Sequence, residues 1–223
     1  MRNFALALCL LAFSVPAWAK PSFVCDFQTS AEDAAPKCDL IGEDLATLKS
    51  LKFHRPSSLH RKFFGKKEGG IYRFVTKHLR RVVIMKNNPP ENAHMAAEAG
   101  DDTIYVYPYY FTKDAVTRYM ALVHESAHLG PDGRPHVSCP TPYIWKAGDI
   151  SAPQPELAGQ IACDNSDTGA YAHGFVFLRS VATTCTNCED KMSEDDAISA
   201  SVESIYHISD PEAVDRLIDG TNK

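Results

Sequence analysis

The stretch Ala121-Leu-Val-His-Glu-Ser-Ala-His-Leu-Gly130 decides what this chain folds around and what chemistry it can perform. Residues four apart on a helix lie on one face, about one turn apart, so the imidazoles of His124 and His128 can converge on a single metal ion. Glu125 lies beside that pair, where its carboxylate can accept a proton from a water molecule at the metal. The H-E-x-x-H spacing is therefore typical of a hydrolytic zinc site. The simpler interpretation is a helix with two ordinary polar histidines.

The composition and the neighbouring residues favour the metal interpretation. Nine histidines and eleven glutamates among 223 residues predict only about 0.02 random occurrences of this pattern. Apolar residues recur at helical spacing, namely Val116, Met120, Val123 and Ala127. Thr112 suits the N-cap of this helix, Asp114 suits its first turn, and Gly130-Pro131 ends it directly after the motif.

A catalytic zinc ion generally takes three protein ligands and leaves its fourth position to water, so one more ligand is needed. Glycines and prolines alternate between residues 130 and 135 and predict a sharp reversal after the helix. That reversal would bring His136 back to the same metal, and His136 is the preferred third ligand. Later residues compete for this role, namely Asp164, Asp167, Glu156 and His173.

The segment Asp164-Asn-Ser-Asp-Thr-Gly-Ala-Tyr171 holds several groups that suit a metal site. Asp164 could ligate the metal, or could orient a ligating histidine through its second ring nitrogen. Asp167 is better suited to cap the following helix. Tyr171 could donate a hydrogen bond to the oxygen that gains negative charge during hydrolysis, and a core tyrosine with its hydroxyl at the surface fits the pattern equally well.

With these residues the chain resembles the zincin metallopeptidases, whose zinc-binding helix carries the H-E-x-x-H letters. Metzincins continue with a glycine and a third histidine, where this chain has Pro131 and Arg134. Gluzincins take a glutamate from a later helix, a role for which Glu156 is conceivable. Aspzincins, which include deuterolysin and lysine-specific endopeptidases, place an aspartate shortly after the second histidine, and His136 lies at a similar distance. The resemblance covers the helix and its exit, and it implies a zincin-like fold, a zinc cofactor and a peptide substrate.

Residues 1–19 predict a signal peptide, with Arg2 as its positive start, an apolar stretch over residues 4–15, and a cleavage site at Ala17-Trp-Ala19. Residues 20–223 then form one domain of a secreted or periplasmic protein. This part of the chain has six cysteines, an even number that favours disulfides in an exported protein. Proximity favours three pairs, namely Cys25 with Cys38, Cys139 with Cys163, and Cys185 with Cys188, although the sequence alone permits other pairings.

The charge and hydropathy argue against a nucleic-acid or membrane partner. The net charge is −5, which gives no electrostatic attraction to nucleic acid or anionic lipid. After the signal peptide, no apolar run approaches the roughly 18 residues that a membrane-spanning helix needs. The basic stretch over residues 55–67 could contact an acidic partner, and a solvated charged face is the favoured interpretation. The oligomeric state stays open.

Periodicity predicts a small sheet before the motif and helices after it. Residues 20–37 predict a loop, residues 38–52 an amphipathic helix, and residues 81–85 and 103–107 two strands. Pro108 ends the pairing of the second strand or places it at an edge, and an extended peptide could add to such an edge. Residues 137–160 predict an irregular loop, in which Tyr143 and Trp145 either line a pocket or pack. Further helices are expected near residues 171–182, 198–205 and 211–219.

We therefore expect an α+β single domain with a zincin-like fold, a small sheet before the metal helix and a mostly helical C-terminal half. The leading functional prediction is an exported zinc-dependent endopeptidase, in which zinc activates water and Glu125 serves as general base. The alternative is a non-catalytic exported protein that binds metal or the cell envelope on a zincin-like scaffold. A thiol oxidoreductase using Cys185 and Cys188 is a third interpretation, which a local disulfide opposes.

Overall fold

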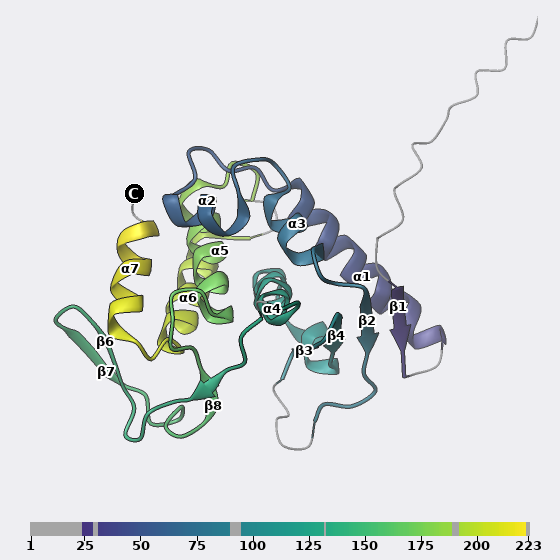
Figure 1. Cartoon of the computed structure of the whole chain (residues 1–223). Helices are drawn as coiled ribbons and strands as arrows, with labels where there is room; N and C mark the ends of the chain where they lie inside the picture. The colour runs from purple at the N-terminus through teal and green to yellow at the C-terminus, as the bar shows by residue number, and fades with distance from the viewer. Residues whose placement is uncertain (1–23, 29–30, 90–94, 132, 189–191, 222–223) are drawn as a thin grey trace, which may run out of the picture.

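The computed structural model describes residues 24–28, 31–89, 95–131, 133–188 and 192–221 (Figure 1). Within these ranges the chain is a mixed α/β protein with seven α-helices and three small β-sheets. The coarse α+β prediction is therefore confirmed. The predicted signal peptide, residues 1–19, lies outside the described residues.

A four-stranded sheet occupies the N-terminal half of the chain. In spatial order its strands are β1 (Val24–Phe27), β2 (Arg81–Ile84), β4 (Thr103–Val106) and β3 (Ala97–Gly100). β1, β2 and β4 run parallel, whereas β3 runs antiparallel to β4 and forms an edge of the sheet. The strands predicted near residues 81–85 and 103–107 are confirmed. The edge next to the motif helix, however, is β3 and not the strand before Pro108, because β3 covers that side of β4.

Three helices precede the motif helix, namely α1 (Ala31–Ser50), α2 (Ser58–Phe64) and α3 (Gly70–Thr76). α1 packs on the sheet and on α3. The loop predicted for residues 20–37 is wrong over much of its length, since β1 and the first turns of α1 fall inside it. Pro36 lies within α1. Because proline normally interrupts a helix, the sequence does not indicate that this helix begins as early as Ala31.

α4 (Ala115–His128) carries the H-E-x-x-H stretch through the middle of the molecule (Figure 1). Its N-cap is Asp114, whose carboxylate accepts a hydrogen bond from the Thr117 N–H at 2.8 Å. Thr112 was the expected cap, but it belongs to a short 3-10 helix, η1 (Pro108–Thr112). α4 packs against α1, α3, β3, α5 and α6, so side chains on several of its faces are buried, as Val116 and Leu122 are.

The second half is mostly helical, as predicted, with α5 (Ala170–Thr184), α6 (Glu194–Tyr206) and α7 (Pro211–Thr221). Before α5, β5 (Val137–Ser138) pairs with β8 (Ile161–Cys163), and β6 (Ile144–Ala147) forms a hairpin with β7 (Ile150–Pro153). The irregular loop predicted for residues 137–160 is therefore wrong over residues 137–138, 144–147 and 150–153, whereas residues 139–143 and 154–160 are irregular as predicted. Its two aromatic side chains pack: the Tyr143 hydroxyl donates to the Tyr206 carbonyl, and the Trp145 indole N–H donates to the Ile205 carbonyl.

Disulfides and a common core hold these elements together. The predicted pairs are confirmed, namely Cys25–Cys38, Cys139–Cys163 and Cys185–Cys188. Three disulfides are typical of proteins that fold in a non-reducing environment. One hydrophobic core extends from α1 and the sheet through α4 to α7, which makes the described residues a single domain. Within the described ranges, no helix combines the length and the apolar character that a bilayer span requires.

Candidate metal centre

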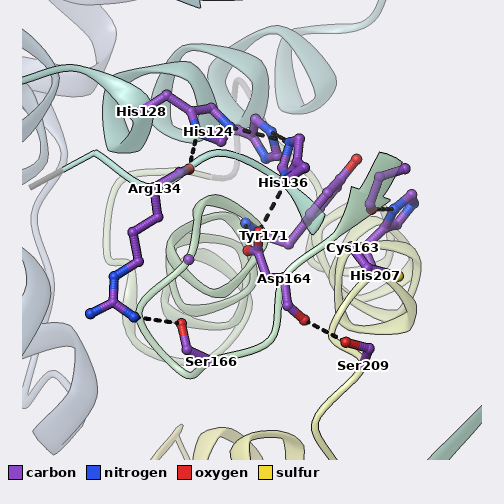
Figure 2. Close-up of polar contacts among 12 residues, drawn as sticks. His124, His128, Arg134, His136, Cys163, Asp164, Ser166, Tyr171, His207 and Ser209 are labelled. Atoms are coloured by element: carbon purple, nitrogen blue, oxygen red, sulfur yellow. Dashed lines mark hydrogen bonds and ion pairs between the residues drawn. The ribbon is translucent and has the colours of Figure 1, made fainter. Parts of the chain in front are cut away.

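Three histidine side chains converge at the C-terminal end of α4 (Figure 2). His124 and His128 come from the last two turns of the helix, and His136 comes from the segment that follows it, directly before β5. The reversal between them depends on glycine. Gly130 has a φ of +84°, and a Cβ on Gly133 would overlap the carbonyl oxygen of His128. The sharp turn expected after the motif does bring His136 to the other two histidines.

The Nε2 atoms of the three histidines face one another. Nε2 of His136 lies 3.1 Å from Nε2 of His124 and 3.2 Å from Nε2 of His128. All three ligand atoms lie within 4.8 Å of one another. Two nitrogens bound to one tetrahedral zinc ion at its usual bond length would be about 3.3 Å apart. The spacing therefore fits a metal ion of that size, and the described residues form no other such group.

The outer ring nitrogens of two of these histidines are already bonded. Nδ1 of His128 donates to the carbonyl oxygen of Arg134 at 2.6 Å, and Nδ1 of His136 donates to Oδ1 of Asp164 at 3.0 Å. A neutral imidazole that donates from Nδ1 presents a lone pair at Nε2. His128 and His136 therefore direct two lone pairs at each other. A cation bound between them would stabilise this arrangement, as in a metal site whose ligating histidines have bonded outer nitrogens.

Burial keeps the cluster in the form that a metal needs. His124 is buried, and burial together with the neighbouring His136 holds the pKa of His124 well below its usual value. Burial, followed by the influence of His136, also lowers the pKa of His128. Nδ1 of His124 is buried and has no hydrogen-bond partner among the described residues. Burial thus favours the neutral state of His124 and His128, and the cluster as a whole offers three imidazoles, a donor set that zinc and related transition metals bind.

Glu125 lies beside the cluster. Its Oε1 is 4.0 Å from Nε2 of His124, and only 12% of its side chain is exposed. Burial raises the pKa of Glu125 to about 8, while a hydrogen bond from the main-chain N–H of Ala99 in β3 acts in the opposite direction. The carboxylate is close enough to the cluster to exchange a proton with a water molecule there, and it also contacts the edge strand.

Tyr171, in the first turn of α5, packs against the same histidines. Its ring centroid is 4.4 Å from that of His124 and 4.9 Å from that of His136. The ring also stacks on His207 at 4.0 Å, and Nδ1 of His207 donates to the carbonyl oxygen of Ala162 at 2.7 Å. Burial raises the pKa of Tyr171 above its usual value, so the hydroxyl stays protonated at neutral pH. Sequence reasoning missed His207, which no local motif marks.

Asp164 connects the cluster to the C-terminal half. One of its carboxylate oxygens accepts from Nδ1 of His136, and the other accepts from the main-chain N–H of Tyr171 at 2.7 Å. Its main chain bonds to the main chains of His207 and Ser209. Of the two roles that the sequence left open, the geometry matches the orienting one: Asp164 lies behind the His136 ring and not among the converging nitrogens (Figure 2).

The remaining candidates for the third ligand lie outside the cluster. Asp167 forms an ion pair with Arg216 at 3.2 Å, and the cap predicted for it is wrong because the N-cap of α5 is Gly169. Glu156 is exposed on the segment between β7 and β8. The ring of His173 stacks between two phenylalanine rings, with centroids 4.3 and 4.8 Å away.

The cluster opens onto a cleft with a volume of about 730 Å³. β3 and the residues before it border the cleft, as do one face of α4, the segment around His136 and the beginning of β8. Two cationic residues also line it, Lys113 before the start of α4 and Arg134 in the segment after its end. The catalytic candidates Glu125 and Tyr171 both line this cleft. The cluster and these two residues therefore face the same cleft.

In comparisons with protein-family models, with curated protein sequences and with solved structures, the chain shows no significant match to any of the three. The functional assignment therefore depends on the chemistry of the residues that converge at the end of α4.

Proposed function

We propose that this protein is an exported zinc-dependent endopeptidase of the zincin type. The observation that carries the proposal is the convergence of the His124, His128 and His136 Nε2 atoms in the lining of a cleft. Two supporting features accompany it. The outer nitrogens of two of these rings are held by hydrogen bonds, and a buried glutamate lies next to the cluster. Together with the H-E-x-x-H spacing, these features favour metal-assisted hydrolysis.

Each residue of the site has a role in this chemistry. A bound zinc ion would polarise a peptide carbonyl and lower the pKa of a water molecule. The three histidines would hold the ion in place. Glu125 would accept the proton of the water and transfer it to the leaving amine. Tyr171 would donate a hydrogen bond to the carbonyl oxygen as negative charge develops on it.

The edge strand β3 favours an extended peptide as the substrate. The Ala96 carbonyl accepts from the Tyr107 N–H, so this residue is bonded toward β4. Alternate residues of an antiparallel pair turn their main-chain groups to opposite sides, which directs those of Ala97 and Ala99 to the free edge. The Ala99 N–H reaches Glu125 in this way. A peptide that adds to β3 would therefore pass over the metal cluster.

The disulfides support the exported location. A protein with three disulfide pairs fits the periplasm or the extracellular space better than a reducing cytosol. The N-terminal sequence, with its apolar stretch and its Ala17-Trp-Ala19 site, supplies the signal for export in this proposal.

The Glu125→Gln substitution tests the proposed reaction. We expect this variant to retain zinc, because Glu125 is not among the converging atoms, and to lose at least about a hundredfold in peptide hydrolysis, because the general base is gone. Zinc content is measured by atomic emission, and cleavage is measured by mass spectrometry on a mixed peptide library. Glu156→Gln is the matched control. It removes a competing ligand candidate that is exposed, and it should change neither measurement.

Two other outcomes would decide against the proposal. Undiminished hydrolysis by Glu125→Gln would exclude Glu125 as the base. Stoichiometric zinc without any cleavage product from the unaltered protein would favour the non-catalytic metal-binding alternative, in which the bond between Glu125 and Ala99 serves only to hold β3. Zinc loading should also raise the melting temperature of the unaltered protein and should have little effect on His128→Ala.

A further inference from the structure

We propose that the cleft selects acidic peptide segments, whose carboxylates bind Lys113 at one end and Arg134 at the other. The inference deepens the proposed function, since it rests on a peptide occupying the cleft. It specifies which peptides would occupy that cleft, and it can be tested without hydrolysis.

Lys113 borders the cleft at the N-terminal side of α4. Its Nζ lies 4.0 Å from the centroid of the Tyr109 ring, which also borders the cleft. This contact orients the ammonium group without neutralising its charge. In the described part of the chain, no carboxylate lies within ion-pair distance of Lys113. A ligand that brings a carboxylate would therefore meet an unneutralised cation.

Arg134 borders the cleft at the other end of α4. Its main-chain carbonyl holds Nδ1 of His128, but its side chain extends away from the three histidines toward Ser166 (Figure 2). The Ser166 Oγ accepts a long hydrogen bond of 3.5 Å from Nη1. Among the described residues Arg134 has no carboxylate partner either. The guanidinium group can bind a carboxylate through two parallel hydrogen bonds.

The acidic groups of the cleft do not cancel these cations. Glu98 accepts a hydrogen bond from the Tyr107 hydroxyl at 2.8 Å, and Glu125 lies beside the histidine cluster and accepts from Ala99. Neither forms an ion pair with Lys113 or Arg134. The cleft therefore has acidic and basic side chains in equal number among the lining residues, but in the described part of the chain neither cation is paired with a carboxylate. The attraction for an anionic ligand is thus local to each unpaired cation.

The length of α4 sets the scale of a peptide that would run from one of its ends to the other. α4 has 14 residues, which corresponds to a helix about 20 Å long. An extended chain rises about 3.3 Å per residue, so about six residues span the distance between the two ends of the helix. A peptide lying along the cleft across the metal cluster would thus present side chains several residues from the scissile bond to each cation.

Peptide binding to zinc-loaded, full-length Glu125→Gln tests this inference. Three fluorescent peptides with the same core carry Glu, Gln or Lys at both outer positions, and their affinities are compared by fluorescence anisotropy. We expect the Glu peptide to bind about three to ten times more tightly than the Gln peptide, with the advantage falling at high salt. Lys113→Met and Arg134→Met should each reduce the advantage, and Lys113→Glu should favour the Lys peptide at that end.

Lys49→Met is the matched control. Lys49 also lies over a tyrosine ring, with its Nζ 5.5 Å from the centroid of Tyr72, but it does not border the cleft. Its loss should leave the acidic preference unchanged. Equal affinities for the Glu and Gln peptides, or no binding of any peptide, in a protein whose circular dichroism shows a native fold would overturn the inference. An acidic preference without cleavage by the unaltered protein would support it and overturn only the proposed hydrolysis. Cleavage without an acidic preference would overturn the inference and support the proposed hydrolysis.

Discussion

The two ends of α4 both hold buried polar clusters, but only one of them is electrostatically complete. Near the N-terminal end, Arg118 donates two hydrogen bonds of 2.8 Å to the carboxylate of Asp44, and the Tyr110 hydroxyl donates to the same carboxylate at 2.7 Å. At the C-terminal end, three imidazoles turn their Nε2 atoms toward one another, 3.1 and 3.2 Å from His136 to His124 and His128, in an arrangement that could hold a metal ion. The first cluster is held together by its own ion pair and hydrogen bonds, whereas the second has the geometry of a site that could hold a metal ion.

This difference separates a structural role from a functional one. Buried polar groups in native proteins are nearly always satisfied, and the cluster around Asp44 follows that rule while it joins α1 to α4. The histidine cluster departs from the rule at a place that opens onto a cleft. Together with the convergence of three Nε2 atoms, the unpartnered Nδ1 of His124 among the described residues makes this end of α4 the candidate for a binding role.

Removing the acid from the complete cluster should have the largest effect. Asp44→Ala leaves the Arg118 guanidinium half-buried without a counter-charge, so this end of α4 would become as incomplete as the other. We expect the free energy of unfolding to fall by about 3–5 kcal/mol, the usual cost of breaking a buried ion pair. Urea denaturation of the metal-free protein, followed by circular dichroism, measures this change.

An exposed ion pair provides the control for Asp44→Ala. Arg81 and Asp26 lie 3.2 Å apart, with about half of each side chain exposed. Asp26→Ala should cost less than about 1 kcal/mol, because solvent screens such pairs. Equal losses in the two variants would show that the Asp44 cluster is no more important for stability than a surface contact, and the contrast between the two ends of α4 would lose its basis.

Acid should lower the free energy of unfolding of the metal-free protein. Burial lowers the pKa values of His124 and His128, so the unfolded chain takes up protons more readily than the folded one, and stability is lost as the pH falls below about 6.5. His60 is buried elsewhere, against Ser180, and burial lowers its pKa to about 4. Protonation of His60 therefore also destabilises the folded protein as the pH falls. His60→Phe should therefore reduce the loss of stability between about pH 6.5 and pH 4 by about 2–3 kcal/mol, as measured by urea denaturation at each pH.

Adding zinc tests whether the remaining acid-dependent loss of stability arises at the histidine cluster. In the His60→Phe background, a bound zinc ion would hold the imidazoles of the cluster in their neutral form, so the remaining acid-dependent loss should shift to lower pH when zinc is added. An unchanged pH profile with zinc would contradict a metal site at this end of α4.

The local part of the site could be predicted from sequence. The positions of His124, Glu125 and His128 follow from the period of a helix, and the glycines and prolines before His136 indicate a turn tight enough to bring it back. The three disulfide pairs follow from proximity along the chain. These predictions succeed because each depends on residues that are close in sequence.

The other parts of the site depend on contacts between distant segments. β3 has the sequence Ala-Glu-Ala-Gly, which lacks the β-branched residues that indicate a strand, and it forms through its pairing with β4. His207 reaches Tyr171 only because α6 ends beside β8, where Asp164 forms a bridge with Ile208. Periodicity within one segment does not indicate such contacts. Neither β3 nor His207 could therefore be assigned to the site from the sequence.

The smallest expected effect concerns the residue that orients His136. Asp164→Asn keeps the size of the side chain but replaces the charged acceptor that faces Nδ1 of His136, so the ring would be held less firmly and would be a weaker base. We expect zinc affinity to fall about tenfold to a hundredfold, as measured by competition with a chromophoric chelator. Asp167→Asn is the matched control, since Asp167 pairs with Arg216 away from the cluster and its loss should leave zinc affinity unchanged.

A substitution at Gly169 should displace the same carboxylate. A Cβ on Gly169 would overlap the carboxylate of Asp164, so Gly169→Ala should displace that group from His136 and weaken zinc binding in the same direction as Asp164→Asn. The two substitutions act on one interaction, and the double variant should therefore bind zinc about as well as the weaker of the two single variants. Additive losses would mean that Gly169 acts through the start of α5 and not through Asp164. Unchanged affinity in Asp164→Asn would remove this carboxylate from the metal site and leave the ring of His136 positioned by the turn alone.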